Sequence, residues 1–257
     1  MTHLPQRVAV VAGGSSGIGL ATVSSLLDEN IKVAFFGQSS EHVESAKEKL
    51  SVHARAGNIF AHTVDVTERS QILRFFDELA GLWSMPDILV YSAGISPKGP
   101  RGATPFVEVS AEEWQLVQAV NVTGAMLCCQ AVLPHMLERG FGRIVLVGSI
   151  AGRTIPRIAG AAYVTSKSAL SGLTRVLVAN TAGRDITVNL VAPGRIATDM
   201  AGPPDSDTNR AALARIPVGR LGKPDDVAAA IRFLVSDSAG FINGATLDVN
   251  GGEFAPL

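Results

Sequence analysis

The chain has 257 residues, of which 47% are hydrophobic and 18% are charged, and its formal net charge is −1. This length suffices for one large α/β domain or two small ones. A net charge close to zero provides no basic field for nucleic acid or an anionic membrane, so we expect neither as a partner.

The elements predicted in chain order alternate between strands and helices. Short apolar runs predict strands at residues 7–12, 32–37, 59–66, 87–94, 143–149 and 186–194, and a last short strand within 246–252. The runs are almost continuously apolar, as in strands buried on both faces. Helices are predicted at 18–28, from Ser110 to about Leu137, at 160–180 and from Pro224, and Ser110 with Glu113 matches a capping box.

This alternation predicts an α/β fold: a Rossmann-type, doubly wound parallel sheet of about seven strands with helices on both faces. No linker rich in proline, glycine or serine divides the chain, so we expect a single domain over residues 1–257. Residues 195–222 have the weakest pattern and follow the sixth strand, where parallel sheets bind ligands. We interpret this segment as a substrate lid.

Other features indicate a reduced, cytoplasmic protein without a metal site. Residues 1–11 lack a signal-peptide pattern, and no apolar run approaches the roughly 18 residues of a membrane span. The two cysteines, Cys128 and Cys129, are adjacent in an apolar segment and are expected to be buried free thiols. The five histidines have no metal-ligand spacing.

A glycine-rich loop, AGGSSGIG, follows the first predicted strand and opens the first helix. Its glycines, Gly13, Gly17 and Gly19, fit neither the G-x-G-x-x-G fingerprint nor the P-loop. A strand–loop–helix context nevertheless favours a phosphate, because glycines allow close approach and the helix N-terminus supplies N–H groups and partial positive charge. We expect the loop to bind the pyrophosphate of a dinucleotide.

The segment YVTSK places Tyr163 and Lys167 four residues apart in a predicted helix, hence on one face. A phenol with a pKa near ~10 is a poor acid–base group at neutral pH. An adjacent ammonium group stabilises the phenolate, so we expect Lys167 to lower the pKa of Tyr163. The pair then exchanges a proton with an alcohol or a developing alkoxide.

Together these motifs resemble one family. The matching positions, in chain order, are Gly13, Gly17 and Gly19, Asp65 after the third strand, Asn121, Ser149, Tyr163 with Lys167, and Pro193-Gly194 after the sixth strand. From about Arg7 to Gly252 the chain resembles the main branch of the short-chain dehydrogenase/reductases. The resemblance implies hydride transfer between a nicotinamide cofactor and a carbonyl or secondary alcohol substrate, with 3-oxoacyl-carrier-protein reductases among the similar members.

The resemblance also implies residue roles. Tyr163 is the catalytic acid/base, Ser149 hydrogen-bonds the substrate oxygen, and Lys167 holds the nicotinamide ribose and tunes Tyr163. Asn121 helps a water to relay protons to Lys167. The implied cofactor-binding residues are Gly13, Ser15, Ser16, Gly17, Ile18, Gly19, Gln38, Asp65, Val66, Ser92, Ala93, Gly94, Tyr163, Lys167, Pro193, Gly194, Ile196 and Thr198, and no metal is expected.

Three positions depart from the family pattern. Ala12 stands where the family usually has threonine, and Tyr91-Ser92-Ala93-Gly94 stands where it has Asn-Asn-Ala-Gly. We expect a lost hydrogen bond at the first and a weaker or water-mediated cofactor contact from Ser92. The interval from Ser149 to Tyr163 is about one residue longer than usual, which predicts a bulge of residues 155–160 over the substrate.

The choice of cofactor depends on the end of the second strand. An NAD enzyme normally has an acidic residue about 20 residues after the glycine loop, bound to the ribose hydroxyls. Here Gln38, Ser39 and Ser40 are neutral, as are Ser15 and Ser16 in the loop. Neutral donors bind a 2′-phosphate without repelling it, so the sequence weakly favours NADP(H) over NAD(H).

Several arginines are predicted near the substrate pocket, namely Arg101, Arg153, Arg157 and Arg195. Either they bind an anionic or phosphopantetheine-bearing substrate, or they are solvated and ion-paired. Carrier-protein docking usually needs a basic patch on the helix after Ser168, and Ala179 provides none there. A small ketone or an acyl thioester therefore remains an equal expectation.

Two other functions are compatible with parts of the pattern. A nucleotide-binding regulatory protein with little catalysis would explain Ala12 and Ser92, but the complete Ser-Tyr-Lys-Asn set disfavours it. A sugar-nucleotide epimerase shares the Tyr-xxx-Lys pair but has different glycine spacing and a larger C-terminal region. The family implies a homotetramer, and apolar Phe254 and Leu257 at the chain end predict burial against another subunit.

Overall fold

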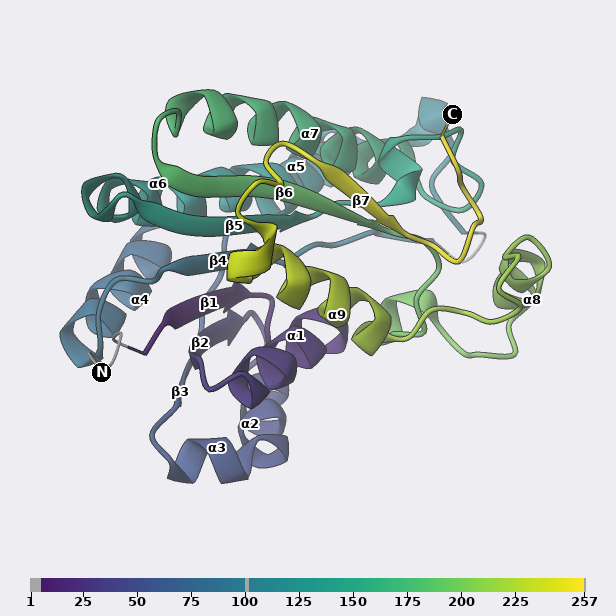
Figure 1. Cartoon of the computed structure of the whole chain (residues 1–257). Coiled ribbons are helices and arrows are strands. Elements are labelled where there is room, and N and C mark those ends of the chain that lie inside the picture. The colour runs from purple at the N-terminus through teal and green to yellow at the C-terminus, as the bar shows by residue number, and fades with distance from the viewer. Residues whose placement is uncertain (1–5, 100–101, 257) are drawn as a thin grey trace.

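The computed structural model describes residues 6–99 and 102–256, and its centre is one parallel sheet (Figure 1). The strand order is β3-β2-β1-β4-β5-β6-β7, and every neighbouring pair is parallel. The strands are β1 (Val8–Ala12), β2 (Lys32–Gly37), β3 (Ile59–Thr63), β4 (Ile88–Tyr91), β5 (Phe141–Val147), β6 (Asp185–Pro193) and β7 (Thr246–Val249). The predicted doubly wound α/β fold is confirmed.

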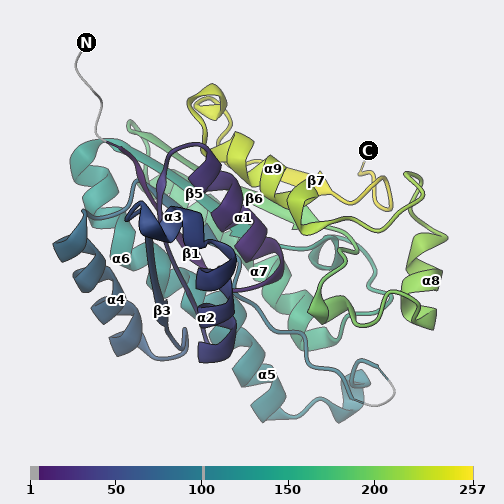
Figure 2. The same ribbon diagram turned by 90° about the horizontal axis from the view of Figure 1, so that it is seen from below.

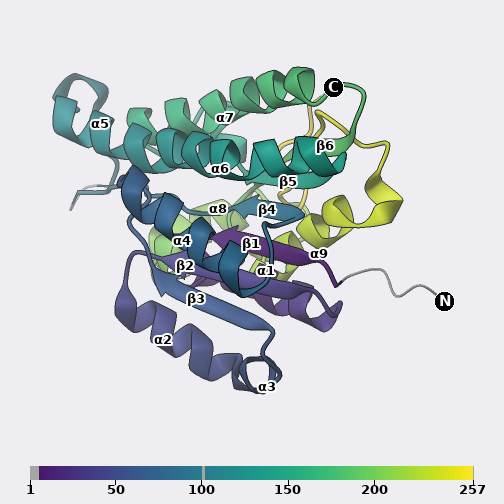
Figure 3. The same cartoon turned by 90° about the vertical axis from the view of Figure 1, so that its left-hand side faces the viewer.

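Helices cover both faces of this sheet (Figures 2 and 3). They are α1 (Gly17–Asp28), α2 (Ser40–Lys49), α3 (Ser51–Arg55), α4 (Arg69–Leu82), α5 (Ala111–Gln118), α6 (Gly124–Arg139), α7 (Ala161–Asn180), α8 (Asp207–Leu213) and α9 (Pro224–Val235). Side chains alternate along each strand: Val8 and Val10 face a core shared with α4, α6 and α7, whereas Ala9 and Val11 face α1, α2 and α9. Burial on both faces explains the continuous apolar runs.

Two strands end three residues earlier than predicted. The strand expected at 59–66 stops at Thr63, and the one expected at 87–94 stops at Tyr91. The residues that follow, 64–66 and 92–94, leave the sheet at its carboxyl edge and line a cavity there. These residues therefore belong to the ligand-binding edge of the sheet and not to its hydrogen-bonded strands.

The long helix predicted from Ser110 to Leu137 is interrupted. A π-helical turn (Ala119–Thr123) separates α5 from α6. The Ser110 hydroxyl accepts a hydrogen bond from the Glu113 amide at 3.1 Å, but the Glu113 carboxylate accepts one from the Thr104 hydroxyl at 2.9 Å. The capping box is thus only half formed, because Glu113 is used to hold the preceding loop.

By length and composition alone, one helix in the described part of the chain, Ala111–Arg139, is apolar enough to cross a membrane. Polar residues such as Gln118, Asn121 and Gln130 interrupt this helix, so the prediction that no uninterrupted apolar run reaches the length of a membrane span is unaffected. In this fold the apolar side of the helix, including Val132 and Met136, packs into the core beneath the sheet.

The segment 195–222 is more ordered than its sequence pattern indicated. It contains a short 3-10 turn (Asp199–Ala201) and α8, which projects from the body of the protein in Figure 1. Asn209 is buried and donates to the carbonyl oxygens of Ala201 and Pro203 at 3.3 and 2.7 Å. These bonds tie α8 to the 3-10 turn within the segment.

Candidate active site

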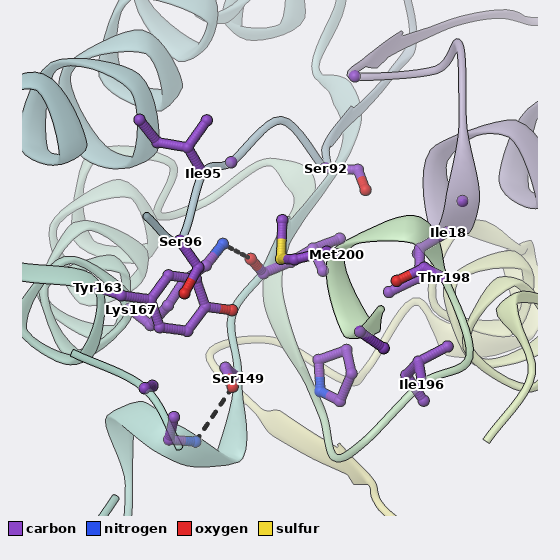
Figure 4. A pocket seen from close by; sticks show the side chains of 18 of the residues that line it. Ile18, Ser92, Ile95, Ser96, Ser149, Tyr163, Lys167, Ile196, Thr198 and Met200 are labelled. Carbon is purple, nitrogen blue, oxygen red and sulfur yellow. Dashed lines mark hydrogen bonds between the residues drawn. The ribbon is translucent and has the colours of Figure 1, made fainter. Parts of the chain in front are cut away.

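A cavity of about 720 Å³ opens at the carboxyl edge of the sheet (Figure 4). Nearly all the residues that the sequence assigned to a site lie on its walls. These are Gly13, Ser15, Ser16, Gly17, Ile18, Gln38, Asp65, Val66, Ser92, Ala93, Gly94, Ser149, Tyr163, Lys167, Pro193, Gly194, Ile196 and Thr198. Gly19 and Asn121 do not line the cavity, and both support it from behind.

The glycine loop is held tightly against the sheet. The amides of Gly13 and Gly14 donate to the Phe36 carbonyl at 2.8 and 3.0 Å, and Gly13 and Gly17 have φ values of 75° and 50°. A Cβ on Gly19 would lie 1.9 Å from the Gly13 carbonyl oxygen. Glycine at these positions therefore brings the first turn of α1 directly onto the loop, which is the cradle that a pyrophosphate needs.

The sequence departures at Ala12 and Ser92 are locally compensated. Ala12 is buried, and its carbonyl accepts a hydrogen bond from the Ser92 amide at 2.9 Å. The loop and the end of β4 are thus joined by the backbone without a threonine hydroxyl. The Ser92 side chain lies on the cavity wall, where a cofactor contact remains available to it.

Tyr163, Lys167 and Ser149 meet at one end of the cavity (Figure 4). Tyr163 and Lys167 lie on the same face of α7, with the Lys167 Nζ 5.6 Å from the centre of the Tyr163 ring. Ser149 follows β5, and its Oγ accepts a hydrogen bond from the Ala151 amide at 3.1 Å. Lys167 is buried and donates to the Val147 carbonyl at 2.8 Å.

The expected lowering of the pKa of Tyr163 is wrong for the protein alone. Burial raises the pKa of Tyr163 above its usual value, and a hydrogen bond with Ser149 opposes this only in part. Burial also lowers the pKa of Lys167 to about 8. The same low-polarity surroundings disfavour both charged forms. The Lys167 ammonium donates to the Val147 carbonyl and not to the phenol, so it does not offset this effect at Tyr163.

Asn121 lies in the π-helical turn with its side chain fully buried. Its amide group donates to the Ile95 carbonyl at 3.0 Å and to Ser166 Oγ at 2.9 Å, and its oxygen accepts from the Ile95 amide at 2.8 Å. The side chain therefore ties the loop after β4 to α7. Because both amide hydrogens are used, a direct role for its amide N–H groups in a proton relay is not available in this arrangement.

Tyr91 is a supporting residue whose role sequence reasoning missed. It is fully buried, and its hydroxyl donates to the Val120 carbonyl in the π-helical turn. A Cβ on Gly124 would lie 2.4 Å from this hydroxyl, so glycine makes room for it. Tyr91, which stands at the first Asn of the family motif, thus forms a hydrogen bond from β4 to the turn that contains Asn121.

The opposite end of the cavity is polar. The Gln38 amide donates to Asp65 at 3.2 Å, and the other Asp65 oxygen accepts from the Thr67 amide and hydroxyl at 2.9 and 2.7 Å. Burial raises the pKa of Asp65, but these hydrogen bonds outweigh it, and the pKa lies below its ordinary value. His42 lies on the same wall, a position that the sequence interpretation did not use.

The predicted arginines separate into different groups. Arg153 forms an ion pair with Asp248, and its guanidinium lies 5.3 Å from the centre of the Phe254 ring. Arg157 is exposed on the cavity wall, and Arg101 lies outside the described residues. Arg195 donates to Asn209 Oδ1 and to the Ala201 carbonyl, each at 2.7 Å.

Two expectations about loops can be placed in the structure. Residues 154–159, in the longer interval before Tyr163, all line the cavity, and Ile155 is 86% exposed. Phe254, expected at a subunit interface, folds back over Arg153 and lines the same cavity. Leu257 lies outside the described residues.

Comparisons with known proteins agree with this geometry. A family model described as enoyl-(acyl carrier protein) reductase matches residues 12–253. A 2-(S)-hydroxypropyl-CoM dehydrogenase of Xanthobacter autotrophicus is 37% identical, over 98% of both chains. A 3-oxoacyl-[acyl-carrier-protein] reductase of Thermotoga maritima is 33% identical, over 97% of this chain and 98% of that protein.

A crystal structure of a 3-oxoacyl-[acyl-carrier protein] reductase from Brucella melitensis superposes with a TM-score of 0.90 at 31% identity, covering 98% of this chain and 92% of that one. The chain therefore belongs to the short-chain dehydrogenase/reductase family. It is an oxidoreductase that acts on carbonyl and alcohol groups with a nicotinamide cofactor.

Proposed function

We propose that Tyr163, Ser149 and Lys167 perform proton transfer and substrate orientation in a carbonyl reductase/alcohol dehydrogenase. The observation that supports this most is their convergence in the cavity that the glycine loop also lines. The cradle formed by Gly13 and Gly19, which a Cβ would fill, fits the phosphates of a dinucleotide. The nicotinamide, when bound, supplies or accepts the hydride.

In the reductive direction, Tyr163 donates its proton to the substrate oxygen, which Ser149 orients by a hydrogen bond. A pKa raised by burial keeps the phenol protonated and ready to donate. In the oxidative direction the phenol must lose this proton first, so a cationic Lys167 nearby assists. Asn121 acts through position, because its amide holds the loop after β4 against α7.

The experiment that tests this mechanism is Tyr163→Phe, which removes only the hydroxyl. Turnover of ketones and alcohols, followed by nicotinamide absorbance, should fall at least about 100-fold. Nucleotide affinity, measured by fluorescence titration, should stay within about threefold of the unmodified protein because the ring is retained. Undiminished turnover would refute the assignment.

For the cofactor, we propose a preference for NADP(H). Gln38, Ser39 and His42 border the cavity beyond β2 and carry no negative charge, and the nearby Asp65 carboxylate is engaged by hydrogen bonds from Gln38 and Thr67. A Brucella melitensis reductase of similar fold is described with bound NAD, so both nucleotides must be compared. The KM values for NADPH and NADH decide the matter, and a hundredfold preference for NADH would contradict the proposal.

The remaining expectations are also proposals. A single domain with residues 195–222 as substrate lid fits the position of this segment beside the cavity. The location in the cytoplasm and the homotetramer are proposals as well. Association is supported by exposed apolar side chains on and around α7, α9 and β7, namely Val176, Phe233, Phe241 and Leu247. Sedimentation as a monomer would rule it out. Relatives include 3-oxoacyl-[acyl-carrier-protein] reductases and a D-threitol dehydrogenase, so a 3-oxoacyl thioester belongs in the first substrate panel.

A further inference from the structure

We propose that Lys98 and Arg195 bind an anionic group of the substrate. The substrate is accordingly a carbonyl or secondary alcohol compound that carries a carboxylate, sulfonate or phosphate apart from the reacting carbon. This inference rests on the proposed function, since it concerns the substrate of the same cavity. It adds residues from two loops, after β4 and after β6, that the catalytic assignment does not use.

Lys98 reaches across the cavity from the loop after β4. Its ammonium donates to the Met200 carbonyl at 3.3 Å, and both residues line the cavity with Tyr163. Figure 4 shows Met200 between the Tyr163 end and the side where Ile18 and Thr198 lie. The contact is long and its acceptor is neutral, so the Lys98 charge is not compensated by it.

Arg195 provides a second cation on the same wall. It follows Pro193-Gly194 at the end of β6, and both of its hydrogen bonds, to Asn209 and to the Ala201 carbonyl, have neutral acceptors. Burial and the positive charge of Arg195 both lower the pKa of Lys98. The two cations therefore repel each other, and a bound anion would relieve that repulsion.

Two of the other cations of this cavity are paired with carboxylates, whereas Arg157 is exposed on its wall and Lys167 belongs to the catalytic end. Arg153 is paired with Asp248, and Arg215 with Glu253 at 3.0 Å. Lys98 and Arg195 have no carboxylate within ion-pair distance among residues 6–99 and 102–256. Glu253 is near enough to raise the pKa of Arg195 somewhat, but burial dominates and lowers it, and Glu253 is held by Arg215.

The cavity lining also includes apolar side chains, together with the acidic Asp199 next to Met200. Ile95, Ile155 and Met200 are among the apolar lining residues, and Ile155 and Met200 are 86% and 49% exposed. Exposed apolar side chains beside a cation pair fit a substrate with a hydrocarbon segment and one charged end. The phosphates of the dinucleotide are expected at the glycine loop instead, near Ile18.

The test uses methyl ketones whose carboxylate lies at increasing distance: 3-oxobutanoate, 5-oxohexanoate and 7-oxooctanoate, each compared with its neutral methyl ester. For at least one spacing, the unmodified protein should prefer the acid in kcat/KM. Lys98→Gln should lower this acid-to-ester ratio by about 10- to 100-fold, as loss of a charge-assisted hydrogen bond implies. Lys98→Arg should restore most of the ratio, because it retains the positive charge.

Lys49→Gln is the matched control, since Lys49 is exposed at the end of α2 and does not line the cavity. It should leave the acid-to-ester ratio unchanged. Raising the salt concentration should reduce the preference in the unmodified protein more than in Lys98→Gln. The Kd for nucleotide alone should be the same in the unmodified protein and in Lys98→Gln. Weaker nucleotide binding by Lys98→Gln would assign the cations to the cofactor and overturn the inference.

The two proposals fail in different ways. Turnover of the esters without a preference for any acid, or an equal ratio in Lys98→Gln and Lys49→Gln, would overturn the anion site and leave the proposed function intact. Calorimetric titration of the same pairs into the nucleotide complex gives the preference without turnover. Acid-selective binding that depends on Lys98 but gives no reaction would support the site and count against the proposed function, whereas no selective binding would overturn the site.

Discussion

Replacing the buried Lys167 by methionine should make the protein inactive and, at neutral pH, more stable. Methionine has a similar length and carries no charge, so the main change is removal of the ammonium group. Burial lowers the pKa of Lys167 from 10.5 to about 8. Because each pH unit of such a difference corresponds to about 1.4 kcal/mol, the charged form costs the folded protein about 3 kcal/mol.

Removing the ammonium avoids this cost, but part of the resulting gain in stability is offset. Lys167 donates to the Val147 carbonyl at 2.8 Å, and methionine leaves this acceptor unpaired, at a cost of about 2 kcal/mol. Lys167→Met should therefore be about 1 kcal/mol more stable at pH 7. The folded pKa lies below the unfolded one, so the penalty in the unmodified protein is relieved as the pH rises from 8 to 10.5. The order of stability should consequently reverse near pH 9.

The assay is urea unfolding of both proteins without nucleotide at several pH values between 7 and 10. The difference between the two proteins cancels the titration of all other groups, including the buried cysteines. Lys49→Met, at an exposed site on α2, serves as control and should show no pH-dependent difference. A difference in unfolding free energy between Lys167→Met and the unmodified protein that stays constant over this range would refute the reasoning. In a separate assay, the turnover of Lys167→Met should be at least about 100-fold lower than that of the unmodified protein.

Two other substitutions test the supports of the site. Gly19→Ala places a Cβ 1.9 Å from the Gly13 carbonyl oxygen and should weaken nucleotide binding at least about tenfold by fluorescence titration, whereas Gly81→Ala, with nothing within 4 Å, should not. Equal affinities in both variants would contradict a pyrophosphate at this loop. Tyr91→Phe leaves the Val120 carbonyl without its donor and should lower the unfolding free energy by about 1–3 kcal/mol and reduce kcat, since the turn it braces holds Asn121. Unchanged urea midpoint and kcat would show that the turn does not depend on this bond.

Much of the fold could be predicted from the sequence because its signals are local. Runs such as RVAVVA are apolar at every position, and burial of Val10 and Val11 on opposite faces of β1 follows from the two-residue period. The approach of α1 to the glycine loop requires Gly13 and Gly19, and both are visible in the sequence. Tyr163 and Lys167 share a face because they are four residues apart in a helix.

Other features depend on neighbours that are distant in the sequence. The π-helical turn at Asn121 depends on partners such as Tyr91 and Ile95, and the helical pattern of residues 110–137 gives no sign of it. Likewise, the sequence could not decide which arginines are ion-paired, because Arg153 and Asp248 are 95 residues apart.

The sequence by itself therefore determined the succession of strands and helices along the chain, the glycine loop, and the placement of Tyr163 and Lys167 on one face of α7. These features depend on residue spacing within one element. Only the tertiary structure decided the direction in which the pKa of Tyr163 is shifted and which charged group lies near Lys98. The first depends on how much protein surrounds the phenol, and the second on a loop that lies 97 residues further along the chain at Arg195. Burial and charge act through space, and spacing along the chain does not specify them.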